Sequence, residues 1–126
     1  MLGKADVIAF VPTRDPQRAR AFYEGVLGLE FVGEDLFAKV FKANGVMVRV
    51  VNVSTVEDFR PHPFTVLGWR VESAEGTVRA LGEKGVTFER YAGMQMDEMG
   101  IWRSPSGAKV AWFKDPDGNI LSVTEG

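Results

Sequence analysis

Cysteine is absent from this chain of 126 residues, and histidine occurs only once, at His62. Without thiols the sequence cannot form disulfides, thiolate metal sites or cysteine nucleophiles, and a single imidazole excludes a metal centre built from several histidines. A large part of metal and nucleophilic chemistry is therefore excluded.

Long apolar runs and an excess of basic charge are also missing. No run approaches the roughly 20 residues that span a bilayer, and the apolar stretch near the N-terminus is too short for a secretory signal peptide. The 15 basic and 17 acidic side chains are mixed along the chain, so no basic stripe indicates a nucleic-acid or membrane surface. We expect a cytoplasmic protein with neither nucleic acid nor a membrane as a partner.

What the sequence does contain is enough apolar residues, 45% of the total, to fill the core of one domain. Residues 6–11 are typical of a strand. Asp15 followed by Pro16 predicts the start of a helix, because the first can cap the helix and the second suits its first turn. Gly28 is placed to end that helix after one amphipathic face.

Three strand-like segments follow the helix, at residues 29–32, 36–42 and 46–53. The last two are joined by Asn44 and Gly45, a strong signal for a two-residue hairpin, because both central residues of a type I′ turn need positive φ. The first half of the sequence therefore reads as a βαβββ module.

A polar connector with two prolines, residues 54–63, separates module 1 (about 1–53) from module 2 (about 64–126). The second half repeats the order of elements, with a helix capped by Ser73 after the strand at 64–71. Its further strands are predicted at 86–90, 109–114 and 119–125. The repeated order indicates an internal duplication.

One segment of the second half, YAGMQMDEMGIWRSPSG at 91–107, has no counterpart in the first. Insertions in one copy of a repeat usually lie in loops, and often on the binding face. Its methionines and aromatic rings can adapt to an apolar ligand. They can equally cap the core or fill a dimer interface, and Asp97 and Glu98 are expected to be solvated.

Three motifs, ARAFYEGVLGLEFV, GWRVES and WFKDPDGNILSV, resemble those of the vicinal oxygen chelate superfamily, which takes in glyoxalases, bleomycin-resistance proteins and extradiol dioxygenases. The resemblance covers almost the whole chain. It implies that residues 1–126 form a single domain of the α+β class, in which two βαβββ modules make a half-barrel sheet around a shared cavity. It also implies a homodimer and, in the enzymes of the family, a divalent metal in the cavity.

The metal positions of the family correspond here to Asp6, Arg49, Val66 and Ser122. Of these only Asp6 is a good ligand, and a catalytic metal needs about three protein ligands of suitable charge. An arginine among them would oppose the cation electrostatically. We therefore expect no metal and no cofactor.

Strand alternation indicates what the cavity contains instead. The candidates for ligand contact from the strands and from the insertion are Asp6, Phe10, Met47, Arg49, Arg70, Met96, Trp102 and Ser122. Two guanidinium groups in an apolar cleft can bind a carboxylate or phosphate. In the alternative interpretation, Arg49 or Arg70 pairs with Asp6 as a structural ion pair, or lies at a strand edge in water. Trp69 and Trp112 are expected in the core, and His62 at the surface.

These observations favour a glyoxalase- or bleomycin-resistance-like protein that binds a small organic molecule, neutral or anionic, in a metal-free cavity. One alternative is a lyase, isomerase or dioxygenase-type enzyme of the same superfamily, with an atypical metal site or with Asp6, Asp97 or Glu98 as the base. Another is a structural or regulatory dimer without a substrate. The sequence leaves open whether the chain is an enzyme.

Overall fold

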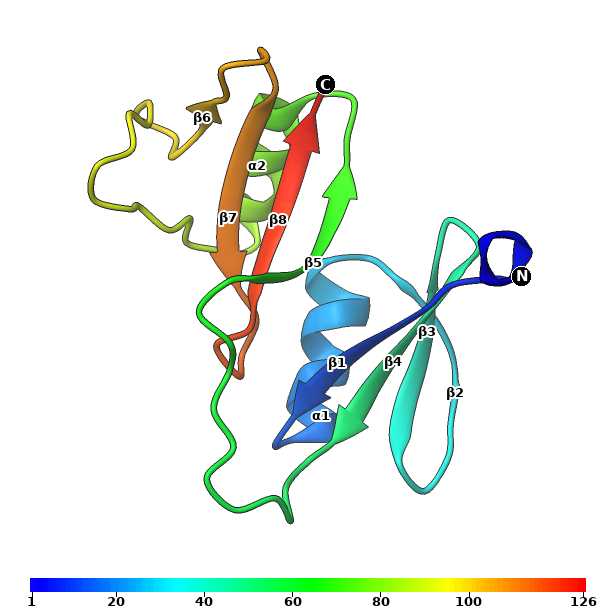
Figure 1. The fold of residues 1–126 in the computed structure, drawn as a ribbon. Coiled ribbons are helices and arrows are strands. Elements are labelled where there is room, and N and C mark those ends of the chain that lie inside the picture. Colours follow the sequence, from blue (N-terminus) through cyan, green and yellow to red (C-terminus); the bar gives the residue numbers. More distant parts are fainter. The chain divides into compact units, whose positions relative to one another are not determined.

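The computed structural model describes all residues from 1 to 126, which form two compact units, Met1–Pro61 and His62–Gly126. Each unit contains one four-stranded mixed sheet and its own helix (Figure 1). The fold is therefore of the α+β class, built from two βαβββ modules.

The first sheet has the strand order β1-β4-β3-β2, with β1 and β4 parallel and the other neighbours antiparallel. A short 3-10 helix, η1 (Leu2–Lys4), precedes it. Its strands are β1 (Ile8–Thr13), β2 (Glu30–Glu34), β3 (Ala38–Ala43) and β4 (Val46–Asn52). The predicted hairpin is confirmed, since φ is 48° at Asn44 and 84° at Gly45.

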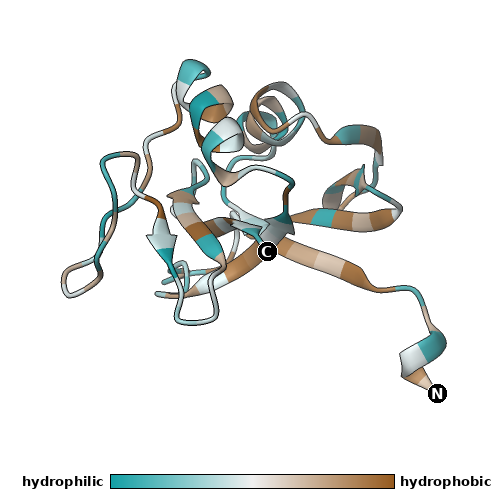
Figure 2. Cartoon of the chain, turned by 90° about the horizontal axis from the view of Figure 1, so that it is seen from above, coloured by the Kyte–Doolittle hydropathy of each residue, from teal (hydrophilic) through white to brown (hydrophobic).

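The helix of the first unit begins where the capping residues predict. It consists of α1 (Pro16–Arg20), which continues as a π-helical segment, η2 (Ala21–Val26). The Asp15 side chain accepts a hydrogen bond from the backbone N–H of Arg18 at 3.2 Å, which satisfies one free donor of the first turn. Apolar and polar residues alternate along this helix and along the helix of the second unit (Figure 2), as expected when only one face is buried.

The core of the first unit lies between this helix and one face of the sheet. Val11, Phe41, Val48 and Val50 of the strands are almost completely buried, and each contributes about 1.5–3 kcal/mol through burial. The Tyr23 ring lies 6.0 Å from the Phe41 ring. Because side chains alternate along a strand, the intervening residues point to the other face of the sheet, against which this unit has no second α-helix.

The second sheet has the corresponding order, β5-β8-β7-β6. Its elements are β5 (Thr65–Arg70), α2 (Ala74–Glu83), β6 (Trp102–Arg103), β7 (Lys109–Lys114) and β8 (Ile120–Glu125). The Ser73 hydroxyl caps α2 by accepting from the Gly76 N–H at 3.0 Å. With ten residues α2 is too short to cross a membrane, and no other helix of the structure has the length and apolar character to do so.

The predicted strand at 86–90 is wrong. Only Phe88 forms an isolated bridge, to Phe113, and the Glu89 N–H donates to the Trp112 carbonyl at 2.8 Å. Further along β7 the pairing is made by β6, inside the segment that we expected to be an insertion loop. The edge strand of this sheet is thus split into two short pieces, because the loop at 90–101 leaves the sheet between them.

The DPDGN motif closes the turn between β7 and β8. Asp115 Oδ1 accepts from the N–H groups of Asp117 and Asn119, each at 2.9 Å, and its Oδ2 accepts from Asn119 Nδ2 at 2.8 Å. Asp115 and Asn119 are both buried, and Gly118 has φ of 90°. The motif that carries the family resemblance therefore serves the fold, because it satisfies the polar groups of a buried turn.

Candidate functional site

Ser122 lies on the face of the second sheet opposite to α2, the only helix of this unit. In the ladder it is opposite Gly68 of β5 and Trp112 of β7. The intervening residues of the same strands point the other way, and Phe113, Leu121 and Val123 are almost completely buried on the side of α2. We call the side that carries Gly68, Ser122 and Trp112 the Ser122 face.

A second row of the Ser122 face lies two residues along each strand. It contains Arg70, Thr124, Val110 and Trp102, which are paired in that order from β5 to β6. The structure thus brings three of the predicted site residues, Arg70, Trp102 and Ser122, to one surface.

Ser122 and Gly68 are in unusually close contact. A Cβ atom at position 68 would lie 2.6 Å from the Ser122 Oγ, whereas carbon and oxygen atoms normally stay more than about 3.3 Å apart. Ser122 is only 8% exposed. The hydroxyl therefore occupies the space above the glycine, and no bulky side chain separates it from β5.

Trp112 is the best-anchored aromatic residue of this face. Its indole N–H donates to the Thr65 hydroxyl at 3.1 Å. Its ring lies 5.6 Å from that of Tyr91, edge to face, and 6.0 Å from that of Trp102. All three rings are half-exposed. The expectation that Trp112 belongs to the core is wrong, because the alternation of β7 sends Ala111 and Phe113 to the helix side instead.

The Tyr91 phenol is kept protonated. Burial raises its pKa above the ordinary value of 10.0, and the negative charge of Glu89 raises it further. At neutral pH this hydroxyl can donate a hydrogen bond to a ligand or accept one from it, but it does not act as an anionic base.

The loop at 90–101 is held by Asp97. Its Oδ1 accepts from the N–H groups of Met99 and Ile101, each at 2.9 Å, and Arg90 donates to the Asp97 carbonyl. Beside this turn, Met96 forms a bridge to Trp102. Asp97 is thus a structural residue rather than a merely solvated one, and its turn places Met96 next to the aromatic cluster.

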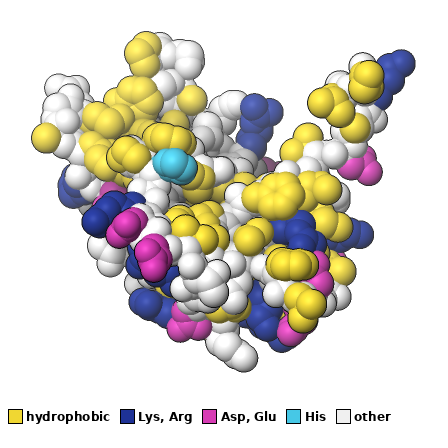
Figure 3. Space-filling model, turned by 60° about the horizontal axis from the view of Figure 1, so that its bottom comes forward, with side chains coloured by type: hydrophobic (Ala, Val, Ile, Leu, Met, Phe, Trp, Pro, Cys, Tyr) yellow, Lys and Arg dark blue, Asp and Glu magenta, His cyan; other side chains and the backbone are white.

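The open face of the first sheet carries the other predicted residues. Arg49 is opposite Phe10, and Met47 lies two residues before Arg49 on the same side. Hydrophobic side chains gather at the molecular surface (Figure 3). Among the most exposed large hydrophobic residues are Phe10, which is 60% exposed, and Phe37, which is 68% exposed.

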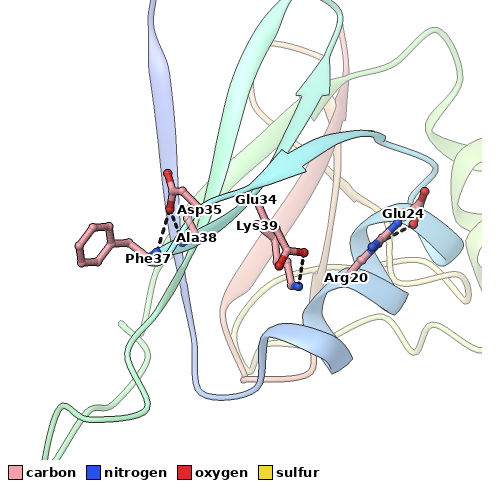
Figure 4. Close-up of polar contacts among 7 residues, drawn as sticks. All are labelled: Arg20, Glu24, Glu34, Asp35, Phe37, Ala38 and Lys39. Carbon is pink, nitrogen blue, oxygen red and sulfur yellow. Dashed lines mark hydrogen bonds and ion pairs between the residues drawn. The ribbon is translucent and has the colours of Figure 1, made fainter.

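Arg49 is not free to bind a ligand anion. Its Nη2 lies 2.8 Å from Asp35 Oδ2, while Asp35 Oδ1 accepts from the N–H groups of Phe37 and Ala38 at 2.8 and 2.9 Å (Figure 4). The hydrogen bond from Arg49, followed by the one from Phe37, holds the pKa of Asp35 below its ordinary value. Arg49 thus forms a structural ion pair.

The partner of that ion pair differs from the alternative interpretation of the sequence. Asp6 precedes the first strand, is exposed and has no partner, so pairing of Asp6 with either arginine is wrong. The strand starts at Ile8, two residues later than predicted, and this shift takes Asp6 out of the sheet. Arg70 has no hydrogen-bond or ion-pair partner at all.

The residues at the family's metal positions do not fit a divalent cation. Arg49 brings a positive charge, Val66 lies at a register shift of β5 and has no donor atom, and Ser122 offers one neutral hydroxyl. The residues opposite Arg49 and Ser122 are Phe10 and Gly68, which cannot coordinate a metal. Neither unit groups three or more carboxylate or imidazole side chains.

Two cavities lie within single units. One of about 170 Å³ adjoins the Asp35 loop of the first unit, and one of about 190 Å³ lies beside Glu75 and Lys109 of the second. Both are smaller than the roughly 300–1,000 Å³ of sites for organic ligands. The open aromatic surface of the second sheet is therefore the stronger candidate.

Sequence reasoning missed Asp35 and Thr65, whereas Tyr91 was among the aromatic rings of the insertion that it considered for ligand contact. The alternation of KVAWFK does indicate that Trp112 shares a face with Val110 and not with the buried Ala111 and Phe113. This signal could have predicted that Trp112 lies on the open face of the sheet. Asp35 gave no comparable signal, because its partner lies 14 residues further along the chain.

The model of the Glyoxalase/Bleomycin resistance protein/Dioxygenase superfamily matches residues 4–123, and this chain belongs to that superfamily. No curated protein matches the sequence. A superfamily member from Sphaerobacter thermophilus DSM 20745 is 25% identical, with a TM-score of 0.75 and complete coverage of both chains.

Two further solved structures share the fold at lower identity. Lactoylglutathione lyase from Agrobacterium tumefaciens is 21% identical, with a TM-score of 0.74, over 98% of this chain and 94% of that one. TnmS3, an antibiotic binding protein from Streptomyces sp. CB03234, is 18% identical, with a TM-score of 0.70, over 99% and 98% of the two chains. These likenesses establish the fold, and the site must be interpreted from the residues of this chain.

Proposed function

We propose that the protein binds a small, planar organic molecule on the Ser122 face, without a metal. The observation that carries this proposal is the cluster of three half-exposed rings, Tyr91, Trp102 and Trp112, on the sheet surface opposite to α2. Large aromatic rings bury 150–250 Å² each when covered, so a flat ligand placed against them gains much contact area.

The aromatic cluster favours binding because its side chains are held in position before a ligand arrives. Thr65 fixes the Trp112 ring through the indole hydrogen bond, and the turn of Asp97 holds Met96 beside Trp102. A preformed surface loses little side-chain entropy when the ligand arrives. Beside the rings, the hydroxyl of Ser122 offers a polar contact to one edge of the ligand.

The side chains support binding better than catalysis. Tyr91 is neutral, and Asp97 is occupied by backbone N–H groups. Asp6 and Glu98 are exposed and have no partner that would position them as a base. The alternative of a lyase, isomerase or dioxygenase-type enzyme, suggested by the likeness to lactoylglutathione lyase, has no comparable support. The antibiotic binding of TnmS3 makes a binding role the natural comparison.

We retain three further expectations as part of this proposal. They are that the chain forms a single domain of the superfamily, that it forms a homodimer, and that it acts in the cytoplasm.

A thermal melting screen against planar aromatic compounds tests the proposed function. We expect a subset to raise the melting temperature of the wild type and to lose this effect with Trp102→Ala. Phe37→Ala removes an exposed ring from the first unit and serves as the matched control. The absence of any stabilising compound, or equal shifts in both variants, would contradict binding on the Ser122 face.

A further inference from the structure

The two arginines on the open sheet faces are in opposite electrostatic states. Arg49 is neutralised by Asp35 at 2.8 Å, whereas Arg70, the last residue of β5, is exposed and has no partner. A free guanidinium group presents several donors in a planar fork that suits a carboxylate or phosphate. Of these two arginines, only Arg70 of the second sheet therefore offers an unused guanidinium group.

Arg70 belongs to the same surface as the aromatic cluster. It is paired with Thr124, in the row that ends at Trp102, and it lies two residues from Gly68 on the same face. Its strand is two strands away from β7, so its backbone lies about 10 Å to the side of that of Trp112. An arginine side chain can span much of this gap, and a ligand of one or two rings can span the remainder.

No carboxylate competes for Arg70 among the strand residues of this face. The alternating positions of β5, β7 and β8 on this side carry apolar, hydroxyl or basic residues. The other cation, Lys114, lies 3.6 Å from Glu89 and is thus already paired. Glu125 points to the opposite side, where it accepts from the Ala74 N–H at 2.9 Å. The Ser122 face therefore has rings at one end and an unpaired positive charge at the other.

We infer that the ligand of this face is an aromatic anion, with its ring system against Trp112 and Trp102 and its acid group on Arg70. This inference rests on the proposed function and adds the class of ligand. The hydroxyls of Ser122 and Thr124 lie between the two ends and can bind polar substituents of the ligand. Arg49 takes no part, because Asp35 retains it.

Isothermal titration calorimetry with a matched pair of probes tests the inference. 2-Naphthoate and 2-naphthamide share their rings and differ in charge. We expect the wild type to bind the acid more tightly, and Arg70→Met to weaken naphthoate binding about tenfold, as loss of one charge-assisted hydrogen bond predicts, with little change for the amide. Arg79→Met removes an exposed, unpaired arginine from α2 and should change neither affinity.

The outcomes separate this inference from the proposed function. Binding of both probes with equal affinity, unaffected by Arg70→Met, would overturn acid recognition but leave aromatic binding standing. A loss of naphthoate binding in Arg49→Met, with Arg70→Met unaffected, would also overturn the inference. Failure of both probes to bind the wild type would count against the proposed function itself.

Discussion

Ser122 and Gly68 face each other across β8 and β5, so close that a Cβ atom at position 68 would lie 2.6 Å from the Ser122 Oγ. The same Cβ would lie 3.9 Å from the Ser122 Cβ, which is an ordinary contact. The conflict therefore involves the hydroxyl alone. At a position where the family resemblance implies a metal ligand, the pair thus leaves a neutral hydroxyl packed against a glycine.

This pair predicts a compensation between two substitutions. Gly68→Ala should lower the free energy of unfolding by about 1–3 kcal/mol, because the new methyl group overpacks the site. In a Ser122→Ala background the same change should cost little, since the hydroxyl is gone. Urea denaturation of the two single variants and the double variant measures the coupling. Equal losses in both backgrounds would show that the contact is not responsible.

A second prediction concerns the buried turn of the DPDGN motif. Asp115→Ala removes the acceptor for three hydrogen bonds within the turn, so buried donors lose their partners. We expect a loss of about 2–4 kcal/mol in chemical denaturation. Asp6→Ala, at an exposed carboxylate without a partner, should stay within about 0.5 kcal/mol of the wild type. A loss at Asp115 no larger than that at Asp6 would contradict the structural role of the motif.

The features that could be predicted from the sequence are those that local chemistry determines. Asp15 and Ser73 cap helices where predicted, and Asn44 and Gly45 adopt the positive φ angles of the expected hairpin. Each depends on residues within a few positions of one another, so the pattern contains all the necessary information.

The features that could not be predicted depend on long-range pairing. The segment at 86–90 has the composition of a strand, but only Phe88 pairs, because β7 is shared with residues 102 and 103 after the intervening loop. The ion pair of Arg49 with Asp35 likewise depends on how the β2–β3 loop turns back over the sheet. Neither arrangement follows from periodicity, which describes one strand at a time.

The ion pair of Asp35 and Arg49 predicts a pH dependence of stability. The pKa of Asp35 is below its ordinary value of 3.8, chiefly because of the hydrogen bond from Arg49. The pKa of Asp35 is lower in the folded chain than in the unfolded chain, so the ionised carboxylate stabilises the fold at pH values above the ordinary pKa. This contribution to stability is lost as the pH falls through the folded-state pKa. Asp35→Asn should therefore lose less stability than the wild type between about pH 5 and pH 2.

Urea denaturation across this pH range measures that difference. Glu98→Gln is the matched control, because Glu98 is exposed and has no partner, and it should keep the wild-type pH dependence. An Asp35→Asn curve parallel to that of the wild type would show that the pair contributes nothing measurable in solution, as is common for exposed ion pairs.

The last prediction concerns the metal of the superfamily. The side chains at its positions are one exposed carboxylate, Asp6, one guanidinium, Arg49, one aliphatic chain, Val66, and one hydroxyl, Ser122. Divalent cations need several oxygen or nitrogen ligands with compensating charge, and a cation beside Arg49 would also be repelled. Protein purified without chelator should therefore contain far less than one zinc, nickel, iron or manganese ion per chain. EDTA should leave the melting temperature unchanged, because no metal-binding energy is coupled to folding. A stoichiometric metal that EDTA removes with a fall in melting temperature would overturn this view and would reopen the enzymatic alternative.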